Sequence, residues 1–168
     1  MDASRKVQAE RVALAALHEP IDGAAELLTI TATTIFQLDD MLRAGVVAKP
    51  LSIGGREHYR LVDAIRIEVA LELELLSWSL PEVAGILAGV DWAQFSLATI
   101  GRREPAALVV KWGGEADLVV GDDVIRAQAG PWDCLNVGHL VHGIITAWTG
   151  NEQEPREPWP MVGQARQA

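Results

Sequence analysis

The segment GGREHYR, at residues 54–60, holds the side chains of this chain best suited to bind an anion. It brings Arg56, His58, Tyr59 and Arg60 within five residues of one another. A guanidinium group carries a permanent charge and a planar fork of donors, which match the oxygens of a phosphate group. The whole chain has a formal net charge of −9, so this basic segment stands out as the place where the protein can contact phosphate.

The charge is distributed unevenly along the sequence. Between residues 43 and 66 there are five cations and two acids, a net charge of +3; the cations are Arg43, Lys49, Arg56, Arg60 and Arg66. Residues 67–90 carry only acids, and residues 105–168 carry eight acids and four bases. The acidic flanks exclude a general nucleic-acid or membrane binder, because they repel polyanions, but they leave a local basic patch free to act.

A second group with possible chemistry consists of Cys134, His139 and His142. Thiolate and imidazole groups are zinc ligands, and the two histidines are three residues apart, on one face of a helix. Cys134 is out of helical register with His139, however, and the sequence offers no further ligand. Core packing explains these residues better, so we predict no metal and no cofactor.

Tryptophans are the third group to consider. Trp112, Trp132 and Trp148 could line a pocket for a small-molecule effector, although tryptophans more often fill a core. No nucleophile with a neighbouring base, no phosphate-binding loop and no cluster of metal ligands is evident. The sequence therefore predicts a protein that is not an enzyme.

Length and composition place the chain among folded proteins of the cytoplasm. Its 168 residues are 49% hydrophobic, enough for one ordinary domain or two small ones. No apolar run is long enough for a transmembrane helix, and the N-terminus lacks the pattern of a secretory signal. The single cysteine, Cys134, cannot form an internal disulfide, which fits a reducing compartment.

The N-terminal half is expected to be mainly helical, with one hairpin. Glycines 54 and 55 predict the turn of a two-stranded hairpin formed from residues 46–59. Asp63 is expected to cap the helix that follows, and Ser79 with Glu82 forms a capping-box pattern. The predicted helices span residues 4–18, 22–28, 33–44, 64–76 and 80–87.

Two features of these helices bear on the interpretation. In helix 33–44, Ile35, Leu38 and Leu42 are expected to face inward, and Thr33, Phe36, Gln37 and Asp40 outward. Helix 64–76 has apolar stripes on two sides, so both sides must be covered. We expect the C-terminal segment or a second subunit to cover the second stripe.

The C-terminal half is expected to contain strands. Residues 91–105 form the predicted domain boundary. Three strands are then predicted in AALVVKW, ADLVV and VIRAQA, followed by a helix from Pro131 to Thr149. The tail, 151–168, is rich in proline and polar residues and is predicted to be disordered.

The order of these elements resembles the DNA-binding domain of the MerR (mercury-resistance regulator) family. The resemblance is carried by AGVV at 44–47, HYRLVD at 58–63 and SLPEV at 79–83, and it covers residues 21–90. No long C-terminal helix follows that could form the family's antiparallel dimerisation coil. The resemblance implies a winged helix-turn-helix at 21–90. With the elements predicted on either side, we expect an α+β protein that also has an N-terminal helix at 1–20 and a small hairpin-and-helix module at 105–150 for dimerisation or effector sensing.

The resemblance also implies roles for particular residues. A winged helix-turn-helix lays its second helix in the major groove of double-stranded DNA while the wing contacts the backbone. The family pattern assigns backbone contacts to Arg56 and Tyr59, with the alternative that Tyr59 is a core ring that anchors the wing. On the outward face of helix 33–44, Gln37 could contact an adenine edge, and Thr33 could contact a phosphate or a thymine methyl group. Three further residues are expected to contact phosphates at the rim of the interface: Arg43, His58 and Arg60.

We therefore expect a DNA-binding transcriptional regulator that acts as a homodimer. The alternative is a winged-helix module for DNA architecture or protein docking, similar to phage excisionase or packaging proteins. A basic wing beside a helix that carries Asp40 and no arginine able to read guanine would suit that alternative role.

Overall fold

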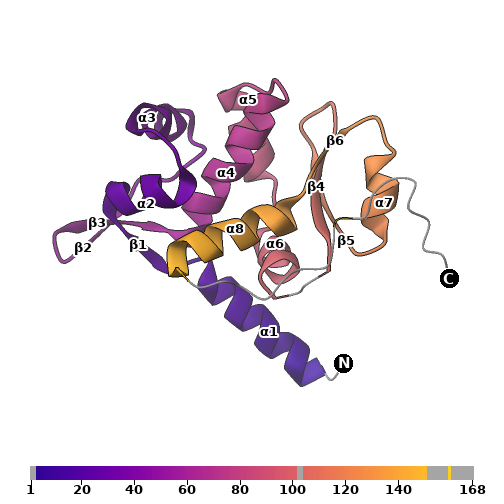
Figure 1. The fold of residues 1–168 in the computed structure, drawn as a ribbon, viewed down its shortest axis with the longest axis horizontal. Helices are drawn as coiled ribbons and strands as arrows, with labels where there is room; N and C mark the ends of the chain where they lie inside the picture. Colours follow the sequence, from indigo (N-terminus) through magenta and orange to yellow (C-terminus); the bar gives the residue numbers. More distant parts are fainter. Residues whose placement is uncertain (1–2, 102–103, 151–158, 160–168) are drawn as a thin grey trace.

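The computed structural model of the protein describes residues 3–101, 104–150 and 159. Within them it has eight helices and two three-stranded antiparallel sheets (Figure 1), which confirms the predicted α+β class. The helices are α1 (Ala3–Ala16), α2 (Gly23–Thr31), α3 (Ile35–Ala44), α4 (Leu61–Leu75), α5 (Leu80–Ala88), α6 (Trp92–Thr99), α7 (Asp123–Gln128) and α8 (Val137–Thr149). The strands are β1 (Pro20–Asp22), β2 (Leu51–Ile53), β3 (Arg56–Arg60), β4 (Ala106–Val110), β5 (Ala116–Val120) and β6 (Asp133–Leu135). The predicted disordered tail, 151–168, lies outside the described residues except for Trp159.

The first sheet contains the predicted hairpin. Strands β2 and β3 are joined by Gly54 and Gly55, both with positive φ (58° and 79°), as a tight hairpin turn requires. The sequence did not predict the third strand, β1, which pairs with the other edge of β3 so that Ile21 lies opposite Tyr59. This pairing ties the end of α1 to the base of the hairpin.

Helices α2 and α3 are separated by a break of three residues, 32–34, close to the predicted position. Thr34 is the N-cap of α3: its hydroxyl accepts from the Gln37 N–H at 3.3 Å, and the Gln37 side-chain oxygen accepts from the Thr34 N–H at 3.0 Å. Gly45 ends the helix in the left-handed conformation, as predicted. Helix α3 therefore starts two residues later than the sequence predicted.

Helix α4 lies at the centre of the fold. Asp63 does cap it, but from inside the first turn, because the helix begins at Leu61 rather than at residue 64. Ile65 and Ile67, one from each predicted stripe, are both fully buried. Helices α2, α5 and α8 all contact α4 (Figure 1), so the C-terminal segment does pack on it, but the cover is incomplete because Leu75 and Leu76 at its end are 79% and 46% exposed.

The second sheet has the strand order β5-β4-β6, and here two predictions are wrong. VIRAQA forms helix α7 instead of a strand, because Val124 and Ala127, three residues apart, are buried on one face. The segment after Pro131 forms strand β6, which pairs with β4 so that Leu135 lies opposite Leu108. Helix α8 therefore begins only at Val137, capped by the Asn136 side chain.

The segment predicted to be a domain boundary contains helix α6. The Asp91 carboxylate caps it, and Phe95 is fully buried. Helix α6 contacts α1 and α8, and the Ser96 hydroxyl donates to the Ala13 carbonyl. One hydrophobic cluster accordingly extends from Leu17 to Ile144. In the described part of the chain, no helix is both long and apolar enough to cross a bilayer.

The buried face of α4 yields a prediction about pH. Glu68 is half-buried beside a hollow between α2, α4 and α8, where Glu72 and His139 are also found. Burial, and to a smaller extent the Glu72 carboxylate, raises the pKa of Glu68 above its ordinary 4.5. A carboxyl group whose pKa rises on folding destabilises the native state above that pKa, and this penalty vanishes below the ordinary value.

We therefore expect Glu68→Gln to raise the Tm at about pH 7 and to leave it nearly unchanged at about pH 3.5. Thermal unfolding followed by circular dichroism at both pH values would measure this. Glu74→Gln, an exposed position on the same helix, is the matched control. An equal change in Tm at the two pH values would contradict the proposed cause.

Candidate nucleic-acid interface

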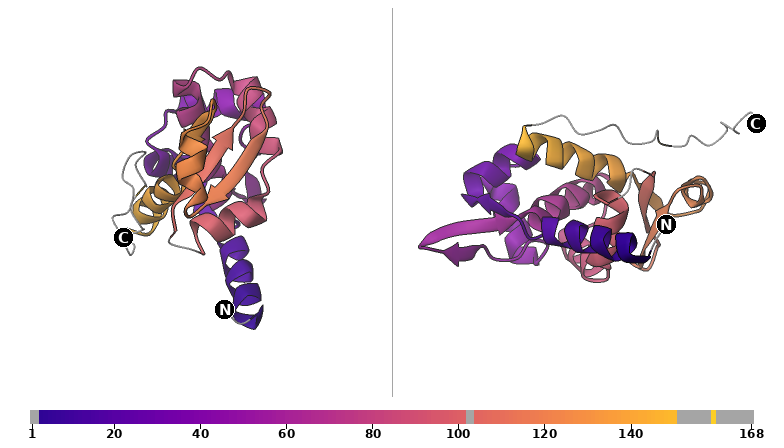
Figure 2. Two further views of the ribbon diagram at one scale, coloured as in Figure 1. Left: turned by 90° about the vertical axis from the view of Figure 1, so that its right-hand side faces the viewer. Right: turned by 90° about the horizontal axis from the view of Figure 1, so that it is seen from below.

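Helix α3 and the β2–β3 hairpin lie at the same end of the molecule. The second sheet and α7 lie at the opposite end, in the front view and in the view from below (Figures 1 and 2). The two elements that the sequence assigned to groove and backbone contacts are therefore presented together. The positions of their side chains decide what this end of the molecule can bind.

The inward and outward faces of α3 differ from the prediction at two positions. Thr33 is buried (7% exposed), and its hydroxyl donates to the Thr31 carbonyl at 3.1 Å, so it does not face a ligand. Ile35 was expected inside but is 53% exposed. The late helix start causes both differences, because the buried stripe becomes Leu38 and Met41. Phe36, predicted to face outward, is 79% exposed.

Gln37 and Arg43 are exposed, as a contact role requires, but both have partners within α3. The Gln37 side-chain oxygen accepts from the Thr34 N–H and hydroxyl, so it cannot also form a two-bond contact with adenine while the cap is intact. The Arg43 guanidinium is paired with Asp39 and, at 3.5 Å, with Asp40. Its charge is therefore largely balanced before any ligand arrives.

Tyr59 has a structural position in the hairpin. It is only 4% exposed, and burial raises the pKa of its hydroxyl, with smaller contributions from Glu57 and Asp63. The ring lies in the core, opposite Ile21 on β1. Tyr59 thus holds the hairpin to the body instead of reaching away from it.

Arg60 and His58 are also held within the protein. The Arg60 guanidinium donates to both oxygens of the buried Asp63 carboxylate, at 3.1 and 3.2 Å. The Nδ1 atom of His58 lies 3.7 Å from an Asp22 carboxylate oxygen on β1 and forms no hydrogen bond among the described atoms. Neither side chain is free to contact a backbone phosphate.

Two cations of this end remain unpaired with any described residue: Arg56 on β3 and Lys49 before β2. Lys49 was counted in the basic segment but not proposed as a site residue. With these two included, the exposed charged residues of α3 and the hairpin are balanced, with three acids and three bases: Asp39, Asp40, Glu57, Arg43, Lys49 and Arg56. Electrostatic attraction to phosphate therefore depends on two side chains per chain.

The same surface also carries apolar side chains that the sequence analysis did not single out. Leu51 and Ile53 on β2 are 48% and 55% exposed, and Ile35 and Phe36 on α3, at the same end of the molecule, are exposed as well. All three residues of β2 are exposed, because no other described strand pairs with its outer edge, and this edge position could not be recognised from the sequence. Four large exposed apolar residues at one end of a molecule indicate a contact surface.

The candidate metal ligands do not come together. Cys134 lies on β6 and His139 and His142 on α8, so the helical spacing used in the prediction does not apply to the cysteine. Burial raises the pKa of the Cys134 thiol, which disfavours the thiolate that a metal would need. Among the residues described, no group of three or more His, Cys, Asp or Glu side chains could hold a metal ion.

Two of the three predicted tryptophans do line a pocket. Trp112 and Trp132 border a cavity of about 580 Å³ near β6, and the third aromatic wall is Trp78, not Trp148. Trp78 follows α4, far away in sequence, so spacing alone could not have placed it there.

Comparison with known protein families and with characterised proteins finds no match to this chain. The function must therefore be argued from the geometry of the interface.

The two arginines of the hairpin should differ in what they do for folding. Because Arg60 neutralises a buried carboxylate, Arg60→Ala is expected to destabilise the protein by about 1–3 kcal/mol, whereas Arg56→Ala should change stability by less than about 0.5 kcal/mol. Urea unfolding of the two variants would measure the difference. Equal destabilisation by both substitutions would show that the Arg60–Asp63 contact does not fix the hairpin.

Proposed function

We propose that the protein is a cytoplasmic DNA-binding transcriptional regulator of the winged helix-turn-helix type, a divergent relative of the MerR family. The observation that carries the proposal is the position of α3 and the β2–β3 hairpin at the same end of the molecule, on either side of α2, with Arg56 on the hairpin unpaired with any described residue. Helix α3 would enter the major groove, and the hairpin would lie along the adjacent backbone.

The structure changes which residues carry this function. Arg56 and Lys49 would contact phosphates, and Arg43 would join them when it exchanges Asp39 and Asp40 for the backbone. Phe36, at the exposed start of α3, would contact thymine methyl groups. Tyr59, Arg60 and Asp63 would position the hairpin without touching DNA.

Two charges per chain give weak attraction, so binding as a homodimer is part of the proposal. Two half-sites would double the number of phosphate contacts. On helix α1, which projects from the body (Figure 1), Val7 and Leu14 are exposed two turns apart on one face. This face is where we place the contact between subunits.

A second candidate function rests on the apolar residues of the same surface. Ile35, Phe36, Leu51 and Ile53 together with balanced charges would suit a module that docks on a protein or shapes DNA within a larger assembly. The experiment below separates this candidate from the first, because docking requires no preference for a DNA sequence.

We expect the protein to bind a duplex from the region upstream of its own coding sequence more tightly than a scrambled duplex. With about four phosphate contacts per dimer from Arg56 and Lys49, and about six once Arg43 joins them, the slope of log K against log salt should be about −4 to −5. Arg56→Ala should make this slope shallower by about 2 and weaken binding to both duplexes. Fluorescence anisotropy at several salt concentrations, with the complex mass from light scattering, would measure affinity and stoichiometry.

Arg126→Ala is the control, because Arg126 is also exposed but lies on α7 at the far end, where it pairs with Asp123. It should bind like the unchanged protein. Failure to prefer the upstream duplex, with no effect of Arg56→Ala, would reject the regulator and leave the docking module.

A further inference from the structure

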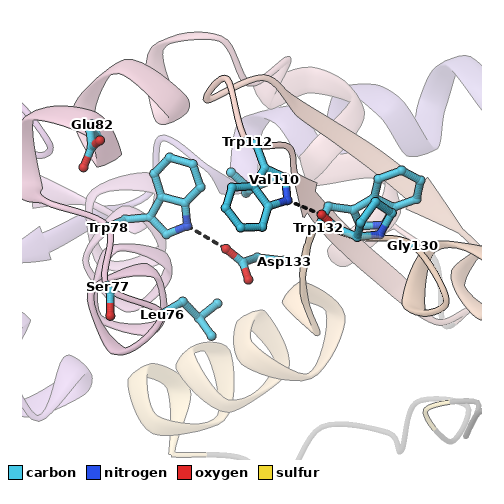
Figure 3. A pocket seen from close by; sticks show the side chains of 10 residues that line it. Leu76, Ser77, Trp78, Glu82, Val110, Trp112, Gly130, Trp132 and Asp133 are labelled. Atoms are coloured by element: carbon cyan, nitrogen blue, oxygen red, sulfur yellow. Dashed lines mark hydrogen bonds between the residues drawn. The ribbon is translucent and has the colours of Figure 1, made fainter.

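The pocket near β6 has walls from two distant parts of the chain. One wall comes from the corner between α4 and α5, which contains Ser77 and Trp78, together with Glu82 on α5. The other comes from the loop and strand around Trp112, Trp132 and Asp133. Figure 3 shows the indoles of Trp78 and Trp112 on the two sides of the Asp133 carboxylate.

The hydrogen bonds of the tryptophans determine what the pocket still offers a ligand. The Trp78 indole N–H donates to the Asp133 carboxylate at 2.7 Å. The Trp112 indole N–H donates to the Pro131 carbonyl, and that of Trp132 to the Ala127 carbonyl. All three indole donors are therefore used within the protein, and the indole faces remain for a ligand.

The charges of the pocket have one sign. Asp133 and Glu82 are carboxylates, and the ten described lining residues include no lysine, arginine or histidine. Hydrogen bonds from the Ser79 hydroxyl and N–H lower the pKa of Glu82, so its charge persists to acidic pH. The second oxygen of Asp133 is not used by Trp78. An anionic ligand would find neither a cation nor a free indole donor.

One tryptophan is unusually open to solvent. Trp112 is 87% exposed, although an indole is among the largest apolar groups a protein can bury. Trp132 is held over Gly130, where a Cβ atom would lie 2.0 Å from the indole ring, so any side chain at that position would displace it. The Trp132 indole is therefore fixed in the pocket wall, whereas the Trp112 indole has an exposed face that a ligand could cover.

We propose that this pocket binds a small organic cation with an apolar body, such as a quaternary ammonium compound. The positive group would lie between the indole faces of Trp78 and Trp112, where the π electrons attract it, with the Asp133 carboxylate as counter-charge. Indole is the most favourable aromatic side chain for this contact, and an alkylammonium group without N–H needs no hydrogen-bond acceptor.

The site also suggests how binding would be transmitted, and this part rests on the proposed regulatory function. Ser77 has a positive φ of 74°, uncommon for a residue with a side chain, and it lies at the corner that joins α4 to α5. A ligand held between Trp78 and Asp133 would fix this corner. Helix α5 in turn contacts α3, so an effector could alter the interface without touching it.

Choline and 3,3-dimethylbutan-1-ol are suitable probes, because they have nearly the same shape and differ in charge. In titrations followed by NMR of the indole N–H groups, choline should shift the signals of Trp78, Trp112 and Trp132 and leave those of Trp92 and Trp148 in place. The neutral alcohol should bind about tenfold more weakly. The titration contains no DNA, so its result is independent of the proposed regulation.

Asp133→Asn keeps an oxygen for the Trp78 N–H but removes the charge, and it should weaken choline binding about tenfold. Asp123→Asn, on α7 outside the pocket, makes the same change in net charge and should have no effect. If Asp133→Asn unfolds, Trp112→Leu at the exposed wall provides the second test and should also weaken binding.

Equal binding of the two probes would show a merely apolar pocket and overturn the proposal. The same holds if neither choline nor the larger benzyltrimethylammonium ion shifts the three indole signals at any soluble concentration. Binding of choline to an otherwise DNA-inactive protein would support the site and reject only its regulatory use.

Discussion

The contact between Arg60 and Asp63 is the interaction on which the arrangement of this protein depends most. Strand β3 ends at Arg60 and helix α4 begins at the next residue, so there is no loop to absorb a change of direction. The first backbone N–H groups of α4 all have acceptors. The Arg60 N–H donates to the Asp63 carboxylate, and the N–H groups of Leu61 and Val62 donate to the carbonyls of Glu19 and Leu17. The hairpin, the central helix and the end of α1 are thereby fixed to one another.

Because α4 is fixed at this end, it can connect the two ends of the molecule. Strand β3 of the hairpin leads directly into its first turn, and its last turn leads into the corner at Ser77 and Trp78. Helices α2, α5 and α8 all contact it, and most of its residues from Leu61 to Leu73 are buried. The proposed DNA contact and the proposed ligand pocket are both built on this helix.

The features that local chemistry determines were predictable from sequence. Thr34 with Gln37, Gly45, Gly54 with Gly55, and Ser79 with Glu82 each mark a boundary that the structure has within two residues. Strand β1 has only three residues and helix α7 only six, and elements this short are determined by the segments that pack against them. Neither was predictable from the local sequence. Within the candidate site, exposure of Arg56 followed from the hairpin pattern, whereas burial of Thr33 depended on where α3 starts. The pairing of Arg43 with Asp39 could have been predicted from the four-residue spacing, but ion pairs between different segments could not.

The edge strand β2 has a further consequence, for colloidal behaviour. Its outer backbone groups have no partner strand, and Leu51 and Ile53 are exposed beside them, which is the arrangement through which chains associate edge to edge. At neutral pH the net charge of −9 opposes this edge-to-edge association through repulsion between copies. Near the isoelectric point of about 4.8 that repulsion is lost, so mild acid should cause self-association before it causes unfolding.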